Sequence, residues 1–130
     1  MNILLDTHIL LWWAANDRRL SSEARARIAD PENDIVVSAA TFWELAIKQH
    51  LRRIDIELHE LQAAVAEDGF VEQPVEVAHT LRLKALPDLH RDPFDRLLIA
   101  QAIDTGARLL TRDDQILAYA GTDGFAPLKA

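Results

Sequence analysis

Four acidic residues stand at equivalent points along this chain, and together they could bind a metal ion. Each lies where a predicted strand gives way to a helix, or early in a helix: Asp6, Glu44, Asp95 and Asp113. In an open parallel α/β sheet such points gather at the carboxyl ends of the strands, where ligands bind. Carboxylates about 4 Å apart repel by about 1–4 kcal/mol a pair, and a divalent cation removes that cost. Oxygen ligands suit Mg²⁺ or Mn²⁺ rather than zinc, and such a site can activate water and stabilise a phosphodiester transition state.

Helix capping is the alternative role for these acids, and the sequence leaves it open. Asp92 before Pro93 fits an N-cap followed by the first helical position, because proline lacks the N–H that a first turn leaves without a partner. Asp95 then lies in the first turn of a helix that is apolar on nearly every side. A carboxylate there either favours the helix dipole or needs a partner. Asp6 could equally be an N-cap.

Glu44 is compatible with two helix starts. The segment Thr41-x-x-Glu44 matches a capping box, in which the glutamate reaches back to the first residue of the motif. A helix starting at Ser38 would instead place Glu44 inside it.

Other kinds of active site lack their sequence signals in this chain. No Gly-rich loop could cradle a nucleotide, Ser38 has no nucleophile elbow, and the absence of cysteine excludes disulfides and thiolate metal sites. The histidines show no H-E-x-x-H or similar ligand spacing, so we interpret them as surface or packing residues: His8, His50, His59, His79 and His90.

Composition and charge set the class of protein. With 130 residues, 49% of them hydrophobic, we expect one domain with a real core. No apolar run approaches the ~18 residues of a membrane span, and the N-terminus lacks the basic region of a signal peptide. We therefore expect a cytoplasmic protein. The net charge of −7 argues against a simple nucleic-acid-binding module, but it fits a metal-dependent nuclease, because four acids in a metal site leave −7 + 4 = −3 elsewhere.

Strands alternate with helices along the whole chain. Apolar runs and turn residues predict strands at 2–5, 35–37, 70–73 and 107–110, with an edge strand at 125–128. Helices are predicted at 8–15, 22–29, 57–68, 75–85, 93–105 and 115–119, and from Ser38 or Thr41 to Lys48. This alternation indicates a three-layer α/β/α sandwich around a mostly parallel sheet of four to five short strands.

The combination of motifs resembles the PIN domain, and more narrowly the VapC-type toxins of bacterial type II toxin–antitoxin pairs. The resemblance covers nearly the whole chain. It rests on Asp6-Thr7-His8, the segment from Ser38 to Glu44, Asp92-Pro93-Phe94-Asp95-Arg96 with the apolar residues that follow, and Leu110-Thr111-Arg112-Asp113. It implies a Mg²⁺- or Mn²⁺-dependent endoribonuclease that forms a homodimer and is held inactive by an antitoxin. Operator DNA would be bound only through that antitoxin.

The resemblance also implies roles for individual residues. The four acids match the catalytic and metal-binding quartet of the family, and Thr7 and Thr111 match its small hydroxyl positions beside the site. Asp92 is typical of one subgroup, and we treat it first as an N-cap and second as a partner of the metal ligands. We prefer Asp113 to its neighbour Asp114 because Thr111-x-Asp113 has the family spacing.

Two other functional classes are weighed against the ribonuclease. A phosphohydrolase or phosphoacceptor domain also has acids clustered at a sheet edge, but its sequence should show Asp-x-Asp after the first strand or a well-placed lysine late in the fold. Here the first strand leads into Asp6-Thr7-His8, and Lys129 is terminal. A non-catalytic α/β interaction module, whose acids merely cap helices, is the third possibility.

Basic and aromatic residues supply candidates for contact with RNA and antitoxin. Candidates for the RNA backbone are Arg18, Arg19, Lys48, Arg52, Arg53, Arg91, Arg96 and Arg112, of which we name Lys48, Arg91, Arg96 and Arg112 as RNA-contacting residues. Trp12 and Trp13 are adjacent on one helix, about 100° apart, so they cannot both face one narrow core stripe. With Trp43 they could form a groove for an antitoxin segment, the alternative being simple core packing.

Overall fold

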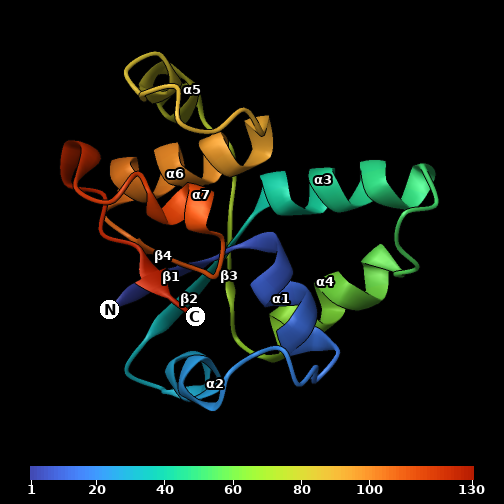
Figure 1. Ribbon diagram of the computed structural model, residues 1–130. Helices are drawn as coiled ribbons and strands as arrows, with labels where there is room; N and C mark the ends of the chain where they lie inside the picture. Colours follow the sequence, from blue (N-terminus) through green and yellow to red (C-terminus); the bar gives the residue numbers. More distant parts are fainter.

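A five-stranded sheet, parallel throughout, forms the middle of the molecule (Figure 1). The computed structural model describes residues 1–130. Its strands are β1 Asn2–Leu5, β2 Asp34–Ser38, β3 Val71–Gln73, β4 Arg108–Thr111 and β5 Leu128–Lys129, in the order β3-β2-β1-β4-β5. The first strand is therefore central and pairs with β2 on one side and β4 on the other.

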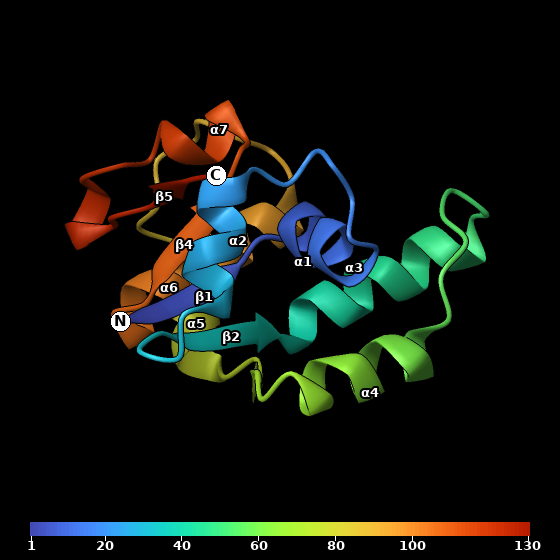
Figure 2. The same ribbon diagram turned by 90° about the horizontal axis from the view of Figure 1, so that it is seen from below.

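Helices cover both faces of this sheet, as Figures 1 and 2 show. One face carries α1 Thr7–Ala14, α2 Ser22–Ala29 and α4 Leu58–Glu67. The other carries α5 Val77–Leu83, α6 Pro93–Thr105 and α7 Asp114–Leu117. After β2, α3 Ala39–His50 extends beyond the sheet and packs against α4 and α6. A 3₁₀ turn, Thr122–Gly124, precedes β5, and none of the helices is long and apolar enough to cross a bilayer.

Two apolar cores result from the alternation of side chains along the strands. Ile3 and Leu5 point into the core beneath α1, α2 and α4, whereas Leu4 between them points into the core beneath α6 and α7. All three are at most 1% exposed, which fits a strand covered on both faces. The predicted α/β/α class and its parallel sheet are thus confirmed.

The differences from the prediction concern element ends. The last strand is Leu128–Lys129 rather than 125–128, because Phe125 is buried in the core beneath α6 and α7 and stands outside the sheet. Helix α5 is shorter than predicted, beginning at Val77. Helix α3 begins at Ala39, and Ser38 is its N-cap, whose side chain accepts a hydrogen bond from the Ala40 N–H. Of the two predicted starts the one at Ser38 is therefore correct, and no capping box joins Thr41 to Glu44.

Candidate functional site

Four segments meet at the carboxyl ends of the strands. β1 leads directly into Asp6, β2 into α3 with Glu44, and β4 into Asp113. Helix α6 runs back along β4, because Gly106 ends it with a φ of 74° that favours glycine and turns the chain into the strand. The start of α6, with Asp95, therefore returns to this same edge.

Asp6 is buried and held by the end of the neighbouring strand. The Thr111 hydroxyl donates to Asp6 Oδ2 at 2.7 Å and accepts from the Asp113 N–H at 3.0 Å. Burial raises the pKa of Asp6 above its usual range, the Thr111 hydrogen bond opposes that rise, and the charge of Asp113 adds to it. One threonine hydroxyl thus ties two of the four acids together.

Glu44 is buried too, and both of its carboxylate oxygens are engaged. The Thr7 hydroxyl donates to Oε1 at 2.8 Å, and the Lys48 ammonium lies 2.7 Å from Oε2. Thr7 follows β1 and Lys48 lies one turn further along α3. Glu44 is therefore part of a hydrogen-bonded ion pair at the base of α1 and α3.

Asp95 is also strongly perturbed by its surroundings. Burial raises its pKa to about 7, with further contributions from the charges of Asp6, Asp92 and Glu44, while a hydrogen bond with His90 opposes the rise. His90 Nε2 lies 2.7 Å from Asp95 Oδ2. Besides Asp92 at the start of its own helix, Asp95 feels the charges of Asp6 after β1 and Glu44 on α3, so the structure brings side chains from these separate segments together.

Capping explains only some of these acids. Asp92 is the N-cap of α6 as predicted, accepting from the Phe94 and Asp95 N–H groups at 2.9 and 3.1 Å. Asp113 caps α7 through the Gln115 N–H at 2.8 Å. Asp6 makes no capping hydrogen bond with its side chain, and the side chains of Glu44 and Asp95 bond to other side chains.

The donor set fits a divalent cation. Oxygen atoms of Asp95 and Asp113 and a ring nitrogen of His90 all lie within 4.8 Å of one another. The pKa of Asp6 is raised by burial and that of Asp95 to about 7, so this edge holds more carboxylate than its surroundings stabilise. Such a cluster is what a bound cation would compensate.

The basic residues fall into two groups. Arg96 does not point outward: it donates to the carbonyls of residues 83, 86, 87 and 90 and to the Tyr119 hydroxyl. The guanidinium is therefore committed to the loop before α6, and a contact of Arg96 with RNA stays a prediction. Lys48 likewise turns to Glu44. Arg91 and Arg112 are exposed, and the Arg112 guanidinium carbon lies 5.0 Å from the Trp12 ring centroid.

Sequence reasoning missed His90 and the residues that place it. The buried Tyr119 hydroxyl donates to the Pro87 carbonyl at 2.8 Å and accepts from the N–H groups of Leu89 and His90 at 3.2 and 3.0 Å. Together with Arg96 it fixes the loop so that the His90 ring faces Asp95. The only available signal was that His90 shortly precedes the N-cap of the acid-bearing helix.

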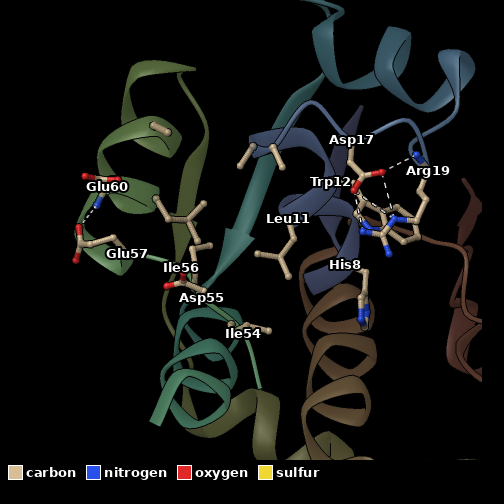
Figure 3. A pocket seen from close by; sticks show the side chains of 14 residues that line it. His8, Leu11, Trp12, Asp17, Arg19, Ile54, Asp55, Ile56, Glu57 and Glu60 are labelled. Atoms are coloured by element: carbon tan, nitrogen blue, oxygen red, sulfur yellow. Dashed lines mark hydrogen bonds and ion pairs between the residues drawn. The ribbon is translucent and has the colours of Figure 1, made fainter. Parts of the chain in front are cut away.

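An apolar groove of about 540 Å³ lies next to the acids, between α1 and the chain entering α4 (Figure 3). Leu11, Ile54 and Ile56 point into it, and acidic side chains stand at its rim: Asp17, Asp55, Glu57 and Glu60. His8 and Trp12 line both this groove and a smaller hollow of about 230 Å³ that contains Asp6 and Asp113. The groove and the smaller hollow therefore adjoin at His8 and Trp12.

The three tryptophans do not share this groove, and their contact with an antitoxin stays a prediction. Trp12 lines it. Trp13 packs against Phe70 and its indole N–H donates to Asp68 at 2.9 Å, so it holds α1 to the end of α4. Trp43 is 60% exposed on α3 and meets the Phe94 ring edge-on at 4.9 Å. They lie apart because they project from different sides of two helices.

Comparison with known proteins gives a consistent result. The model of the PIN domain matches residues 3–122. Ribonuclease VapC22 of Mycobacterium tuberculosis is 32% identical over 126 residues, which cover 90% of this chain and 91% of that protein.

Solved structures share the fold. VapBC-1 from nontypeable Haemophilus influenzae matches with a TM-score of 0.67 and 18% identity, covering 100% of this chain and 97% of that one. VapBC2 from Rickettsia felis, bound to a promoter DNA fragment, gives 0.66 and 16%, covering 99% and 98%. A toxin–antitoxin complex from Klebsiella pneumoniae gives 0.61 and 24%, covering 95% of each. By its sequence and its fold, the chain belongs to the PIN-domain family, within the VapC group.

Proposed function

We propose that this protein is a metal-dependent endoribonuclease that acts as the toxin of a toxin–antitoxin pair. The observation that carries the proposal is the effect of Asp6, Asp92 and Glu44 on Asp95, whose pKa is raised to about 7 by burial and by these charges. Acids from separate segments are held together where a cation would stabilise them. The relative from M. tuberculosis, named a ribonuclease, supports the same activity.

Asp6, Asp95 and Asp113 are the residues we assign to the cation, with Glu44 beside them. A bound Mg²⁺ or Mn²⁺ would supply an acidified water and neutralise charge on the phosphate of the scissile bond. The Thr111 hydroxyl donates to one carboxylate oxygen of Asp6 and so fixes the orientation of that ligand. The Thr7 hydroxyl and the Lys48 ammonium hold the Glu44 carboxylate in place, where its charge helps to raise the pKa of Asp95.

RNA would approach along the exposed arginines beside the acids. Arg112 lies at the hollow that contains Asp6 and Asp113, and Arg91 precedes the N-cap of α6. Their charges would contact phosphates and offset the net charge of −7 near the site. RNA binding should weaken as salt is added, because phosphate contacts release counterions.

Replacing Asp95 by Asn tests the catalytic assignment. Asn keeps the size of the side chain and removes the charge, so we expect a folded protein whose RNA cleavage falls by two or more orders of magnitude. Asp34→Asn, an exposed acid at the opposite end of the sheet, is the matched control and should cleave like the unaltered protein. Equal cleavage by both variants would overturn the assignment.

The groove beside the acids is our candidate for the antitoxin. Its apolar floor and acidic rim fit a segment with apolar side chains flanked by basic ones. The solved toxin–antitoxin complexes of the same fold support a protein partner. Glu60→Lys at the rim should weaken antitoxin binding about tenfold or more, whereas Glu67→Lys on the same helix, outside the groove, should leave it unchanged. Equal affinity for both variants would exclude this groove.

A homodimer is the remaining part of the proposal. Trp43, Ile47 and Leu51 recur every four residues and are 60%, 38% and 52% exposed, which gives the outer face of α3 and its C-cap an apolar stripe. A second copy of the chain would cover it. Sedimentation should show a dimer that Trp43→Glu converts to a monomer, and a monomeric parent protein would contradict this assignment.

A further inference from the structure

We propose that His90 is a ligand of the cation itself, and that this nitrogen makes the site prefer Mn²⁺ to Mg²⁺. The inference rests on the proposed cation site at Asp95 and Asp113. It assigns to that site a ligand whose chemistry differs from that of the four acids.

The distances suit a shared cation. His90 Nε2 and Asp95 Oδ2 are 2.7 Å apart, and one donor atom from each of His90, Asp95 and Asp113 lies within 4.8 Å of the other two. Ligands about 2.1 Å from an octahedral ion are about 3.0 Å apart when adjacent and about 4.2 Å when opposite. The three donors therefore have the spacing of ligands to one ion, with small adjustments of rotamer.

The backbone holds the imidazole in this place. The Tyr119 hydroxyl accepts from the His90 N–H at 3.0 Å, and Arg96 donates to the His90 carbonyl at 3.4 Å. The His90 side chain is 11% exposed and that of Asp95 13%, so water competes little for either. A ligand fixed in advance loses little conformational entropy when the ion binds.

The other histidines lack this arrangement. His79 is buried but bonds to the Glu76 N–H and lies near Asp104, away from the acids. His8 lies on the side of Asp6 and lines the hollow with it, yet it is exposed and does not join the ligand cluster. His8 is therefore a matched control: an imidazole near the same acids that should not bind the ion.

The choice of metal follows from the ligand. Carboxylate and water suit both Mg²⁺ and Mn²⁺, whereas imidazole favours transition ions over Mg²⁺. In the bound form Nε2 would face the ion and the ring proton would sit on Nδ1. The cation would take the place of the hydrogen bond between His90 Nε2 and Asp95 Oδ2.

Pulsed electron paramagnetic resonance of the Mn²⁺-loaded protein tests the ligand directly, since a coordinated imidazole gives a ¹⁴N coupling. We expect that coupling in the unaltered protein and in His8→Gln, and its loss in His90→Gln. Calorimetric titration should show Mn²⁺ binding weakened about 10–100-fold by His90→Gln, with Mg²⁺ binding changed no more than a few-fold.

The outcomes separate this inference from the function on which it rests. Mn²⁺ bound without a ¹⁴N coupling in the unaltered protein would overturn the role of His90 and leave the acid site standing. A coupling that survives in His90→Gln would overturn it as well. If neither Mn²⁺ nor Mg²⁺ binds at millimolar concentration, the proposed cation site fails and the inference fails with it. The measurement on the unaltered protein does not depend on whether a variant folds.

Discussion

Removal of one hydroxyl group, in Tyr119→Phe, should destabilise the protein far more than a surface substitution. The hydroxyl donates to the Pro87 carbonyl at 2.8 Å and accepts from Arg96 at 2.9 Å and from the N–H groups of Leu89 and His90 at 3.2 and 3.0 Å. The ring itself is fully buried, so phenylalanine keeps the packing and loses only these bonds.

The magnitude follows from the bonds lost. A hydroxyl has one donor and two acceptor lone pairs, so four contacts amount to about three full hydrogen bonds. Two neutral bonds contribute about 1 kcal/mol each and one to a guanidinium about 2 kcal/mol. Because water can reach part of the loop, we expect a net loss of about 2–4 kcal/mol. With an unfolding entropy of about 2.1 cal/mol/K per residue, this lowers the Tm by about 7–15 °C.

Urea and thermal unfolding followed by circular dichroism provide the assay. Combining Tyr119→Phe with Arg96→Met should cost less than the sum of the two single changes, because each removes the same bond. A loss below about 0.5 kcal/mol, or strict additivity of the two changes, would refute the view that this hydroxyl fastens the loop.

Three further predictions follow from single contacts. In the metal-free protein the pKa of Asp95 is raised from 3.8 to about 7, so between these pH values the native state holds a proton that the unfolded state has lost. The free energy of unfolding should therefore fall as pH rises from about 4 to about 7, and fall less in Asp95→Asn. An unchanged pH dependence of urea unfolding in Asp95→Asn would contradict this. Hydrogen bonds from Arg19 lower the pKa of Asp17 to about 2, so titration of this carboxyl group by NMR should give a midpoint near 2. In Arg19→Gln the midpoint should return toward 3.8. Equal midpoints in the two proteins would exclude the pairing of Asp17 with Arg19. Gly106→Ala should lower the free energy of unfolding by about 1 kcal/mol, because no atom crowds the new methyl group but alanine disfavours the φ of 74°. Gly106→Asn should lower it less, since asparagine adopts a positive φ more readily. Thermal unfolding measures both, and the reverse order would be evidence against a conformational cause.

Features decided by neighbours in the sequence were predictable. The N-cap of α6 at Asp92, with Pro93 next to it, depends on contacts two and three residues apart. The short apolar strands depend on local patterning, and parallel pairing follows from the helices between them. Once the strands were placed, the convergence of Asp6, Asp95 and Asp113 followed from topology alone.

Features decided by distant side chains were not predictable. The sequence gives the positive charge of Arg96 and so suggests contact with RNA. It does not give the carbonyls and the Tyr119 hydroxyl that accept hydrogen bonds from Arg96, because these are brought together only by folding. The positions of the three tryptophans were not predictable for the same reason, since the indole N–H of Trp13 donates to Asp68, 55 positions away. Helical periodicity gives the direction of a side chain and says nothing of its partner.

The hydrogen bond between Thr111 and Asp6 joins residues 105 positions apart, across the two neighbouring strands β4 and β1. During synthesis from the N-terminus at about 5–20 residues per second, Thr111 is added about 5–20 s after Asp6. Until then β1 lacks one of its two neighbours, and Asp6 lacks both its hydroxyl donor and the Asp113 charge beside it. The cluster of acids therefore cannot form before residues 111–113 have been added. A ribosome making this proposed ribonuclease thus carries, for most of that time, a nascent chain without the assembled site.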